Sequence, residues 1–313
     1  MRYVLDGSVR KGADRIRVTA RLVEAAAGKQ VWAERYDREI ADIFALQDEI
    51  TEAITTAIAP AIGDVERRIA MREPASSLDA WGAYQRGLWH VSKFSKEDNA
   101  LAQECFRQAI ELDPNFRGGY RGLAVAVIQA AGGYLASGQE ELGKEAEALA
   151  RRAVELDGSD AESRAYHSNA FWSCGDYDSA LAEAKTALTL SPNLARGHAN
   201  YGCALIFSGR PKEGIASLEK SIELDPYEPM FLSRLNLLAL GLYFAGEYQA
   251  AVEAAKRTIR AIPDYPLPYR WLAAALGQLG RTTEAKQALE KAIAVAPDMF
   301  DSTSVRLNGG RRR

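Results

Sequence analysis

Cysteine and histidine are scarce in this sequence of 313 residues, and the net charge is not positive. The three cysteines, Cys105, Cys174 and Cys203, lie far apart and form no CxxC pair, which argues against a disulfide framework and a paired-cysteine metal site. We therefore expect reduced thiols that pack in the interior. The formal net charge of -3 and the sequence pI of about 5.8 leave no overall basic field that would hold nucleic acid or an anionic membrane.

Long apolar runs are also missing. No stretch approaches the ~18 residues that are needed to span a bilayer, and the N-terminal residues MRYVLDGSV lack the apolar stretch of a signal peptide. These absences favour a cytoplasmic protein. Because a strand-like alternation begins directly after Met1, we also expect the chain to start partway through a domain.

Local catalytic motifs are absent as well. The sequence contains no GxxxxGK[ST], HExxH or GxSxG pattern, so phosphate binding, zinc hydrolysis and acyl-enzyme chemistry all lack their signatures. His90, His167 and His198 stand singly, where a histidine is usually a packing or surface residue. The sequence predicts no catalytic residue, no cofactor and no metal ion, and therefore no enzyme.

A repeated phrase dominates the rest of the chain. Its variants include SIELDPYEP (221–229), AIELDPNF (109–116) and ALTLSPNL (187–194). A fixed period of 20 to 50 residues is typical of a solenoid of stacked units. The proline, or the glycine that replaces it, recurs with separations of 44, 34, 34, 37 and 34 residues, at Pro114, Gly158, Pro192, Pro226, Pro263 and Pro297.

Each unit is predicted to be a helical hairpin. Within 195–226, the apolar residues Tyr201, Leu205 and Ile206 lie at helical spacing, and SGRP (208–211) ends this first helix. Neighbouring hairpins must stack, because a lone hairpin cannot bury its apolar face. We expect the two longer periods to reflect inserted residues in loops, at 130–141 and near 227–231. The second helix is marked by Ile215, Leu218, Ile222 and Leu224.

These segments resemble tetratricopeptide repeats (TPRs). In 195–228, Tyr201-Gly202 stands at the Leu-Gly pair of the pattern, Gly214 at its small helix-contact position and Pro226 at its proline. The segment 266–299 also matches, and 161–194 matches except that Arg164 and His167 stand where large apolar residues are expected. The resemblance covers about two thirds of the chain and implies a protein-binding solenoid.

The N-terminal residues alternate instead of following a helical period. RIRVTARLV places Ile16, Val18, Ala20 and Leu22 on one face, with Arg15, Arg17, Thr19 and Arg21 on the other. This pattern predicts a half-buried strand. We expect strands at 3–10, 15–24 and 30–37 in an antiparallel meander, one face of which is covered by a helix. The helix carries Ile43, Ile50, Ile54 and Ile58 and is kinked or ended by Pro60.

Residues 2 to 50 resemble the last part of a TolB-N-terminal-like, or FlgO-like, α/β domain. The resemblance implies a bacterial signalling protein, since in that family the domain commonly lies between an N-terminal nucleotide cyclase or winged-helix domain and C-terminal TPRs. It brings no catalytic residue to this chain. The paired metal-binding aspartates of a cyclase have no counterpart in the sequence.

The expected fold class is therefore mainly α, a TPR helical-hairpin solenoid preceded by a small antiparallel three-stranded α/β fragment. We predict the fragment at 1–73, a linker at 74–79 and about six hairpins at 80–299. Residues 300–313, which end in RRR, are predicted to form a disordered basic tail.

The first helix of each hairpin carries a stripe at spacings of three and four, for example Ala165, Asn169 and Trp172. The TPR resemblance implies that this stripe lines a concave groove that receives a peptide or helix, because Asn side chains can bond a peptide backbone and aromatic rings supply apolar contact. The alternative is that the aromatic residues only fill their own hairpins. The candidate groove residues are Asn169, Trp172, Asn200, Cys203, Phe207, Asn236, Tyr243 and Arg270.

We do not expect a chaperone-type carboxylate clamp, because Ala165, Ser233 and Leu237 stand where basic residues are needed. The preferred interpretation is a non-catalytic scaffold that binds a protein or peptide partner, with no nucleic acid and no membrane. Self-association through strand 3–10 or the C-terminal repeat is also expected. The alternatives are the regulatory portion of a class III nucleotide cyclase or of a winged-helix transcription regulator.

Overall fold

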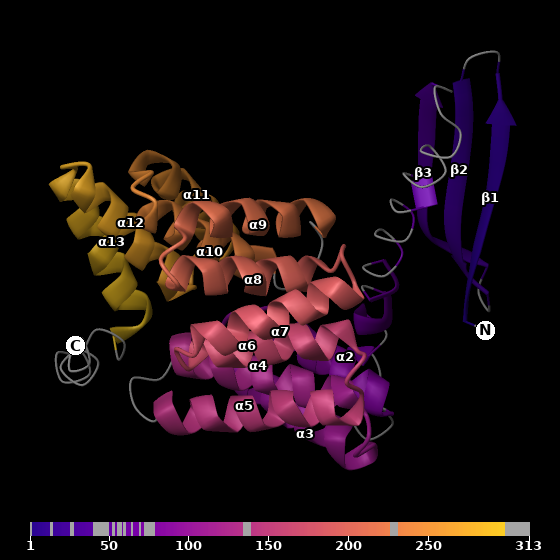
Figure 1. Cartoon of the computed structure of the whole chain (residues 1–313), viewed down its shortest axis with the longest axis horizontal. Coiled ribbons are helices and arrows are strands. Elements are labelled where there is room, and N and C mark those ends of the chain that lie inside the picture. Colours follow the sequence, from indigo (N-terminus) through magenta and orange to yellow (C-terminus); the bar gives the residue numbers. More distant parts are fainter. Residues whose placement is uncertain are drawn as a thin grey trace. The chain divides into compact units, whose positions relative to one another are not determined.

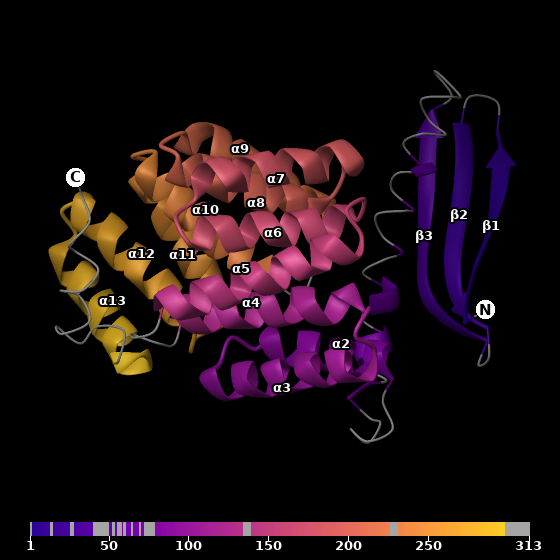
Figure 2. The same cartoon turned by 60° about the horizontal axis from the view of Figure 1, so that its bottom comes forward.

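A computed structural model describes residues 2–12, 15–25, 28–39, 50–51, 54, 58, 61–63, 65–68, 70–71, 79–133, 139–225 and 231–297. The chain divides into two compact units, Met1–Glu73 and Pro74–Arg313. The first unit holds a β-sheet and the second holds stacked helices (Figure 1; Figure 2). The predicted basic tail lies outside the described residues.

The N-terminal unit contains a three-stranded antiparallel sheet in the order β1-β2-β3. The strands pair in simple meander register, with Gly7 opposite Ala20 and Thr19 opposite Arg35, and a bulge lies between Leu22 and Val23. The predicted meander is confirmed. The second strand has the expected bounds, the first is one residue longer, and the third begins one residue earlier and ends two residues later. They are β1 (Tyr3–Lys11), β2 (Arg15–Glu24) and β3 (Lys29–Glu39).

The two faces of this sheet differ as the alternation predicts. Ala20 and Leu22 are each 3% exposed, whereas the arginines between the apolar positions of β2 are exposed. Ile50 and Ile54, which are helical, pack with Tyr36 on the apolar face. A helical segment thus covers one face of the sheet. The predictions made for Ile43 and Pro60 lie outside the described residues.

Helical hairpins make up the described part of the second unit, and no strand occurs there. The first helices pack on one another. Each second helix before α13 packs between its own first helix and the next hairpin, whereas α13 packs on α12. The predicted hairpin solenoid is therefore confirmed over the described residues. The helices are α2 (Ala80–Val91), α3 (Lys96–Leu112), α4 (Arg117–Gly133), α5 (Gln139–Leu156), α6 (Ala161–Ser173), α7 (Tyr177–Leu190), α8 (Ala195–Phe207), α9 (Pro211–Leu224), α10 (Phe231–Phe244), α11 (Tyr248–Ala261), α12 (Pro266–Gln278) and α13 (Thr282–Val295).

Capping side chains define where several helices begin. The carboxylate of Asp79 accepts a hydrogen bond from the Gly82 amide at 2.7 Å, and Asp160 and Asp176 cap α6 and α7 in the same way. Such a cap satisfies one of the four amides that a helix start leaves without a partner.

Close helix crossings depend on glycine. A Cβ atom on Gly202 would lie 2.7 Å from the carbonyl oxygen of Gly214, and one on Gly214 would lie 2.5 Å from the carbonyl oxygen of Gly202. No side chain fits at that separation. The small helix-contact position predicted at Gly214 therefore lies at the α8–α9 crossing.

One sequence expectation about the insertions is wrong. The residues that lengthen the 44-residue period do not form only a loop, because α4 reaches Gly133 and α5 begins at Gln139. These helices contain 17 and 18 residues, whereas α6 and α7 contain 13 and 14. The alanines near residue 130 favour continuation of the helix. The second expected insertion, near 227–231, lies almost entirely outside the described residues.

The residue before the N-cap of the second helix has a left-handed backbone in five hairpins. In four of them it is a glycine, Gly175, Gly209, Gly246 or Gly280, with φ between 73° and 84°. In the first hairpin it is Phe94, with φ of 54°, directly before the N-cap Ser95. Because a left-handed backbone is unfavourable for a residue with a Cβ atom, Phe94 carries a conformational cost that the glycines avoid.

Candidate functional site

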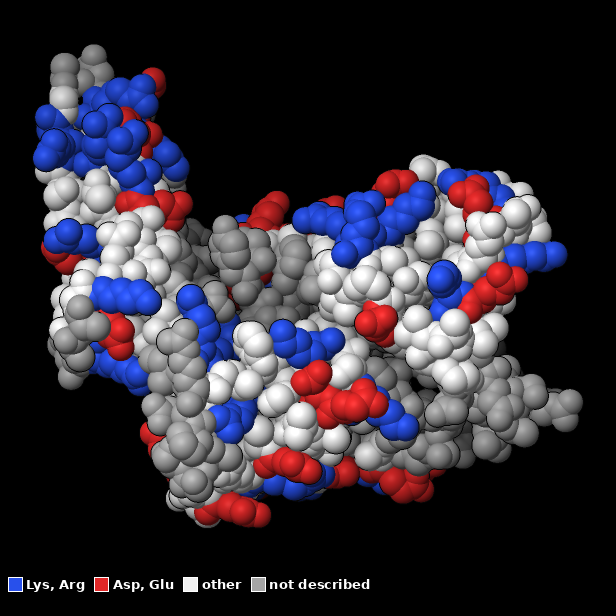
Figure 3. All heavy atoms as spheres, turned by 180° about the vertical axis from the view of Figure 1, so that it is seen from behind, with Lys and Arg blue, Asp and Glu red and all other residues white. Residues whose placement is uncertain are grey.

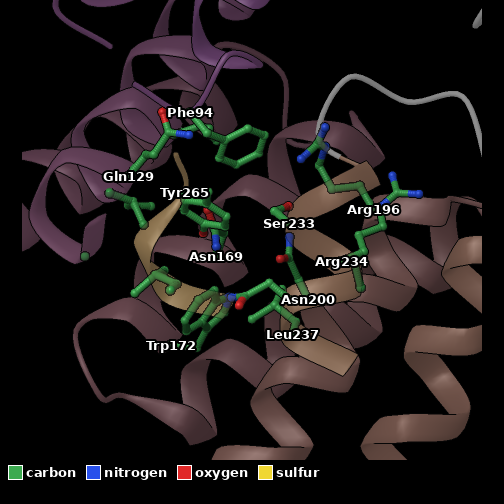
Figure 4. Close-up of a pocket in the computed structure, with 16 residues that line it drawn as sticks. Phe94, Gln129, Asn169, Trp172, Arg196, Asn200, Ser233, Arg234, Leu237 and Tyr265 are labelled. Carbon is green, nitrogen blue, oxygen red and sulfur yellow. The ribbon is translucent and has the colours of Figure 1, made fainter. Parts of the chain in front are cut away.

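A cavity of about 170 Å³ lies among the first helices of the hairpins (Figure 4). We call it the inter-repeat cavity. Helices α4, α6, α8 and α10 contribute most of its wall. Residues at the start of α3 and of α12 complete it. The lining residues are Phe94, Val125, Ile128, Gln129, Gly132, Asn169, Trp172, Arg196, Ala199, Asn200, Ser233, Arg234, Asn236, Leu237, Tyr265 and Leu267.

An aromatic contact joins the first and sixth hairpins at one side of the cavity. The ring centroids of Phe94 and Tyr265 lie 4.8 Å apart, and Figure 4 shows the two rings together at one edge of the site. Phe94 is 2% exposed and Tyr265 is 5% exposed. Burial raises the pKa of Tyr265, so its phenol stays neutral. Phe94 lies between α2 and α3, and Tyr265 is the N-cap of α12. The contact therefore joins the first and the last described hairpin.

Three asparagines come from three successive first helices. Asn169 lies on α6, Asn200 on α8 and Asn236 on α10, and all three line the cavity. The amide of Asn200 donates to the carbonyl oxygen of Ala165 at 2.6 Å, which links α8 to α6. Asn236 is 3% exposed, and its Oδ1 atom has no hydrogen-bond partner among the described residues.

Trp172 supplies the second unpartnered polar atom. Its indole Nε1 is buried and likewise has no hydrogen-bond partner among the residues that the structure describes. The ring is positioned by Phe207, which stacks on it at 5.6 Å with an interplanar angle of 13°. Tyr177 stacks on Phe207 in turn, at 5.6 Å and 9°. Phe207 thus holds the Trp172 ring in place by stacking, and Phe207 itself does not line the cavity.

The two arginines of the cavity are held by other groups. Arg234 is 3% exposed, and its Nη1 donates to the carbonyl oxygens of Ser221 and Asp225 at 3.1 and 3.0 Å. The Arg196 guanidinium lies 4.4 Å from the ring centroid of Tyr166, and its Nε lies 3.6 Å from a carboxylate oxygen of Glu162. No Asp, Glu or Lys is present among the described residues that line the cavity.

Half of the predicted groove residues are therefore brought together, and half are not. Asn169, Trp172, Asn200 and Asn236 line the inter-repeat cavity. Cys203 lies outside it and is fully buried, which raises the pKa of its thiol to about 12 and leaves the thiol protonated.

Tyr243 and Arg270 belong to a different place, around Trp271. The ring centroids of Tyr243 and Trp271 lie 6.0 Å apart, and the Arg270 guanidinium lies 5.3 Å from the Trp271 ring centroid. These residues form an aromatic cluster between the last two hairpins. With Phe207 and Cys203, they complete the set of four predicted residues that do not line the cavity.

The histidines hold structural contacts, as expected. His90 Nδ1 lies 2.8 Å from Asp98, and His198 Nε2 lies 2.9 Å from the carbonyl oxygen of Pro192. His167 is buried between Glu147 and Glu183, at 3.3 and 3.4 Å. No group of His, Cys, Asp and Glu residues suited to a metal ion occurs in the described part of the chain.

A basic surface occupies part of the N-terminal unit. Figure 3 shows Lys and Arg side chains gathered over the sheet. A shallow hollow there is lined by Arg10, Lys11, Arg15 and Arg17 together with Asp37. Arg15 and Arg17 both bond the Asp37 carboxylate, at 3.0 and 2.7 Å, and the Arg17 bond lowers the pKa of that carboxyl group. These ion pairs within the sheet thus neutralise part of the positive charge.

Comparison with known proteins identifies the helical segments. The family model of the tetratricopeptide repeat matches residues 92–116, 195–228 and 269–299. The last two matches cover α8–α9 and most of α12–α13. The chain contains tetratricopeptide repeats. No helix in the described ranges has both the length and the apolar character to cross a membrane.

Two relatives and one solved structure extend this comparison. A Rhizobium meliloti (strain 1021) protein that carries the name adenylate cyclase 3 is 31% identical over 166 residues, which are 52% of this chain and 28% of that protein. Small glutamine-rich tetratricopeptide repeat-containing protein 2 of Mycosarcoma maydis is 36% identical over 78 residues, 24% of this chain and 21% of that protein. The chain thus spans roughly a quarter of the length of these relatives.

The solved structure is the human IFIT1 dimer with m7Gppp-AAAA. It superposes with a TM-score of 0.57 at 14% identity, and the match covers 69% of this chain and 50% of that one. At this identity the likeness establishes the fold of the helical unit. It carries no information about what this chain binds.

Sequence reasoning missed part of the cavity wall. Phe94, Tyr265, Gln129 and Arg234 all line it. Gln129 accepts from the Asn99 amide at 2.8 Å and donates to the carbonyl oxygen of Val91, so it ties α4 to the first hairpin. One signal was present for Phe94, because SKFS (92–95) has Phe where the later hairpin turns have glycine.

Proposed function

We propose that this chain is a non-catalytic protein-interaction scaffold and that it binds a peptide segment of its partner at the inter-repeat cavity. The tetratricopeptide repeats support an interaction role. The position of the site is supported by the cavity that the first helices form together with Phe94 and Tyr265.

The observation that carries the proposal is the pair of unpartnered buried atoms, Trp172 Nε1 and Asn236 Oδ1. A buried polar group that lacks a partner costs about 1 to 3 kcal/mol, and most buried polar atoms in proteins are bonded. A peptide offers a C=O acceptor for the indole N–H and an N–H donor for the amide oxygen, so it satisfies both.

The neighbouring side chains fit the same ligand. Asn169 and Asn200 add amide groups on adjacent helices, next to the aromatic surface of Trp172. Apolar contact with Trp172 would supply affinity, while the amides would fix the direction of the peptide backbone. Cys203, Phe207, Tyr243 and Arg270 have no direct role in this proposal.

The test is a selection of binding peptides from a random-sequence display library on the full chain, followed by titration of the selected peptide. The Trp172→Phe variant keeps the ring that stacks on Phe207 but loses the N–H donor. Asn236→Leu removes the amide acceptor. We expect each variant to raise the dissociation constant of the peptide about tenfold, which corresponds to the loss of a buried hydrogen bond.

Trp81→Phe is the control, because Trp81 packs against Tyr84 and Phe116 near the start of α2 and does not line the cavity. It should leave the dissociation constant unchanged. Equal affinities for the parent chain and both cavity variants, at unchanged helical content, would place the binding surface elsewhere.

A second candidate function is the regulatory portion of a bacterial nucleotide cyclase. The relative named adenylate cyclase 3, of which this chain matches 28%, favours it. We infer that Met1–Glu73 is the end of a TolB-N-terminal-like domain in such a protein. Determining the reading frame upstream of Met1 tests this, because a cyclase domain there supports the inference, while a winged-helix domain would favour a transcription regulator.

A further inference from the structure

We propose that the inter-repeat cavity holds one carboxamide side chain, that of Gln or Asn, from the bound peptide. This inference rests on the proposed function and adds the chemical class of the residue that enters. It follows from the size of the cavity, the two unpartnered atoms and the charge of the wall.

The volume sets the size of the group that enters. A cavity of about 170 Å³ is far too small for a helix, since a helix with its side chains is about 10 to 12 Å across. An engineered protein cavity of about 150 Å³ holds one benzene molecule. The inter-repeat cavity therefore accommodates a single side chain of moderate size, such as that of glutamine.

The contact between Phe94 and Tyr265 limits the cavity at one side. It is maintained although the Phe94 backbone is left-handed, with φ of 54°. A non-glycine residue in this conformation costs about 1 to 2 kcal/mol. Burial of the Phe94 ring against Tyr265 must offset this cost. The contact of Phe94 with Tyr265 is thus part of the cavity wall.

The polar atoms select the chemistry of the entering group. The Trp172 indole can only donate a hydrogen bond, whereas the Asn236 oxygen can only accept one. A carboxamide carries both a C=O acceptor and an N–H donor on one planar group. An aliphatic side chain would leave both protein atoms unpaired.

The charges of the wall argue against cationic side chains. Because no Asp or Glu lines the cavity within the described residues, a Lys or Arg side chain would find no counter-ion. Arg196 and Arg234 attract a carboxylate, although the Nη1 atom of Arg234 already bonds the carbonyl oxygens of Ser221 and Asp225. A carboxylate, however, has no proton to donate to Asn236 Oδ1.

The experiment uses three capped amino acids as probes, N-acetyl-glutamine amide, N-acetyl-methionine amide and N-acetyl-glutamate amide. They have similar length but differ in the terminal group. Binding is followed on the full chain by the NMR signal of the Trp172 indole N–H, which is assigned by its loss in Trp172→Phe. We expect a saturable shift with the glutamine probe, at an affinity about three- to tenfold above the other two probes.

Asn236→Leu is the specificity variant. It should remove the preference for glutamine over methionine, since the acceptor is lost while the apolar wall remains. Trp81→Phe is again the control and should keep the preference. A stronger response to the methionine or glutamate probe, or a glutamine preference that survives Asn236→Leu, would overturn the carboxamide assignment.

Failure of this inference is distinguishable from failure of the proposed function. If display-selected peptides bind in a Trp172-dependent manner but carry no Gln or Asn residue that is essential for affinity, the cavity is a peptide site of another specificity. If neither the selected peptides nor the capped probes shift the Trp172 signal, both proposals fall together.

Discussion

Replacing Phe94 by glycine and by alanine should produce an unusual order of stability. At most buried positions, alanine is the less damaging of the two replacements, because glycine has more conformational freedom to lose on folding. Phe94 has φ of 54°, however, and four later hairpins have glycine at the corresponding place. We predict that Phe94→Gly is more stable than Phe94→Ala.

The magnitudes follow from two separate terms. Both variants lose the buried ring and its contact with Tyr265, and Phe→Ala changes in cores cost about 3 to 5 kcal/mol. Only the alanine variant keeps a Cβ atom in the left-handed region, which costs about 1 to 2 kcal/mol. The extra freedom of the unfolded glycine chain returns about 0.4 to 1 kcal/mol of this difference. The net advantage of glycine is on the order of 1 kcal/mol.

Thermal unfolding followed by far-UV circular dichroism measures this difference. For a helical unit of this size, 1 kcal/mol corresponds to about 2 to 4 °C in Tm. Gly280→Ala is the control, since Gly280 has φ of 73° and a Cβ atom placed there meets no atom within 4 Å. It isolates the conformational term. A double-mutant cycle of Phe94→Leu with Tyr265→Leu should show coupling of about 0.5 to 1.5 kcal/mol.

Two results would refute this reasoning. If Phe94→Ala is as stable as Phe94→Gly while Gly280→Ala is destabilised, the Phe94 backbone is not left-handed. If the Phe94 and Tyr265 substitutions are additive, the first and sixth hairpins do not support each other through this contact.

Three further predictions concern other parts of the chain. Burial raises the pKa of Glu183, but the nearby His167 ring and the hydrogen bonds from Arg164 outweigh this effect, and the net pKa is lowered. Glu183→Gln should therefore cost on the order of 1 kcal/mol at neutral pH. In urea titrations at several pH values, the difference should disappear as the pH falls through the lowered pKa. Gly214→Ala should destabilise the array by several kcal/mol and lower its Tm, because the added Cβ atom meets a backbone oxygen at 2.5 Å. Self-association through the edge strand β1, where Val9 is 65% exposed, should weaken in Val9→Lys when measured by sedimentation; unchanged association would exclude this edge.

The elements of the fold were largely predictable from the sequence because their signals are local. The alternation of apolar and charged residues in β2 determines which face is buried, and the periodic Pro or Gly positions mark the helical hairpins. The structure of the insertion at 130–141 was harder to predict, since an inserted segment rich in alanine can lengthen two helices as easily as it can form a loop.

The candidate site was predictable only in part. Asn169, Trp172, Asn200 and Asn236 follow from helical spacing, because the first helices place one stripe on a common face. The contact of Phe94 with Tyr265 does not, since it joins residues far apart in the chain and depends on how tightly six hairpins curve. Curvature is the sum of small rotations between repeats, which no single repeat reveals.

The central claim is that a peptide binds in the inter-repeat cavity through Trp172 and Asn236. A crystal structure of the full chain with a display-selected peptide tests it most directly. We predict a peptide side chain inside the cavity, with its acceptor bonded to Trp172 Nε1 and its donor bonded to Asn236 Oδ1. A peptide bound elsewhere on the helices, with these two atoms making no hydrogen bond to it, would contradict the account.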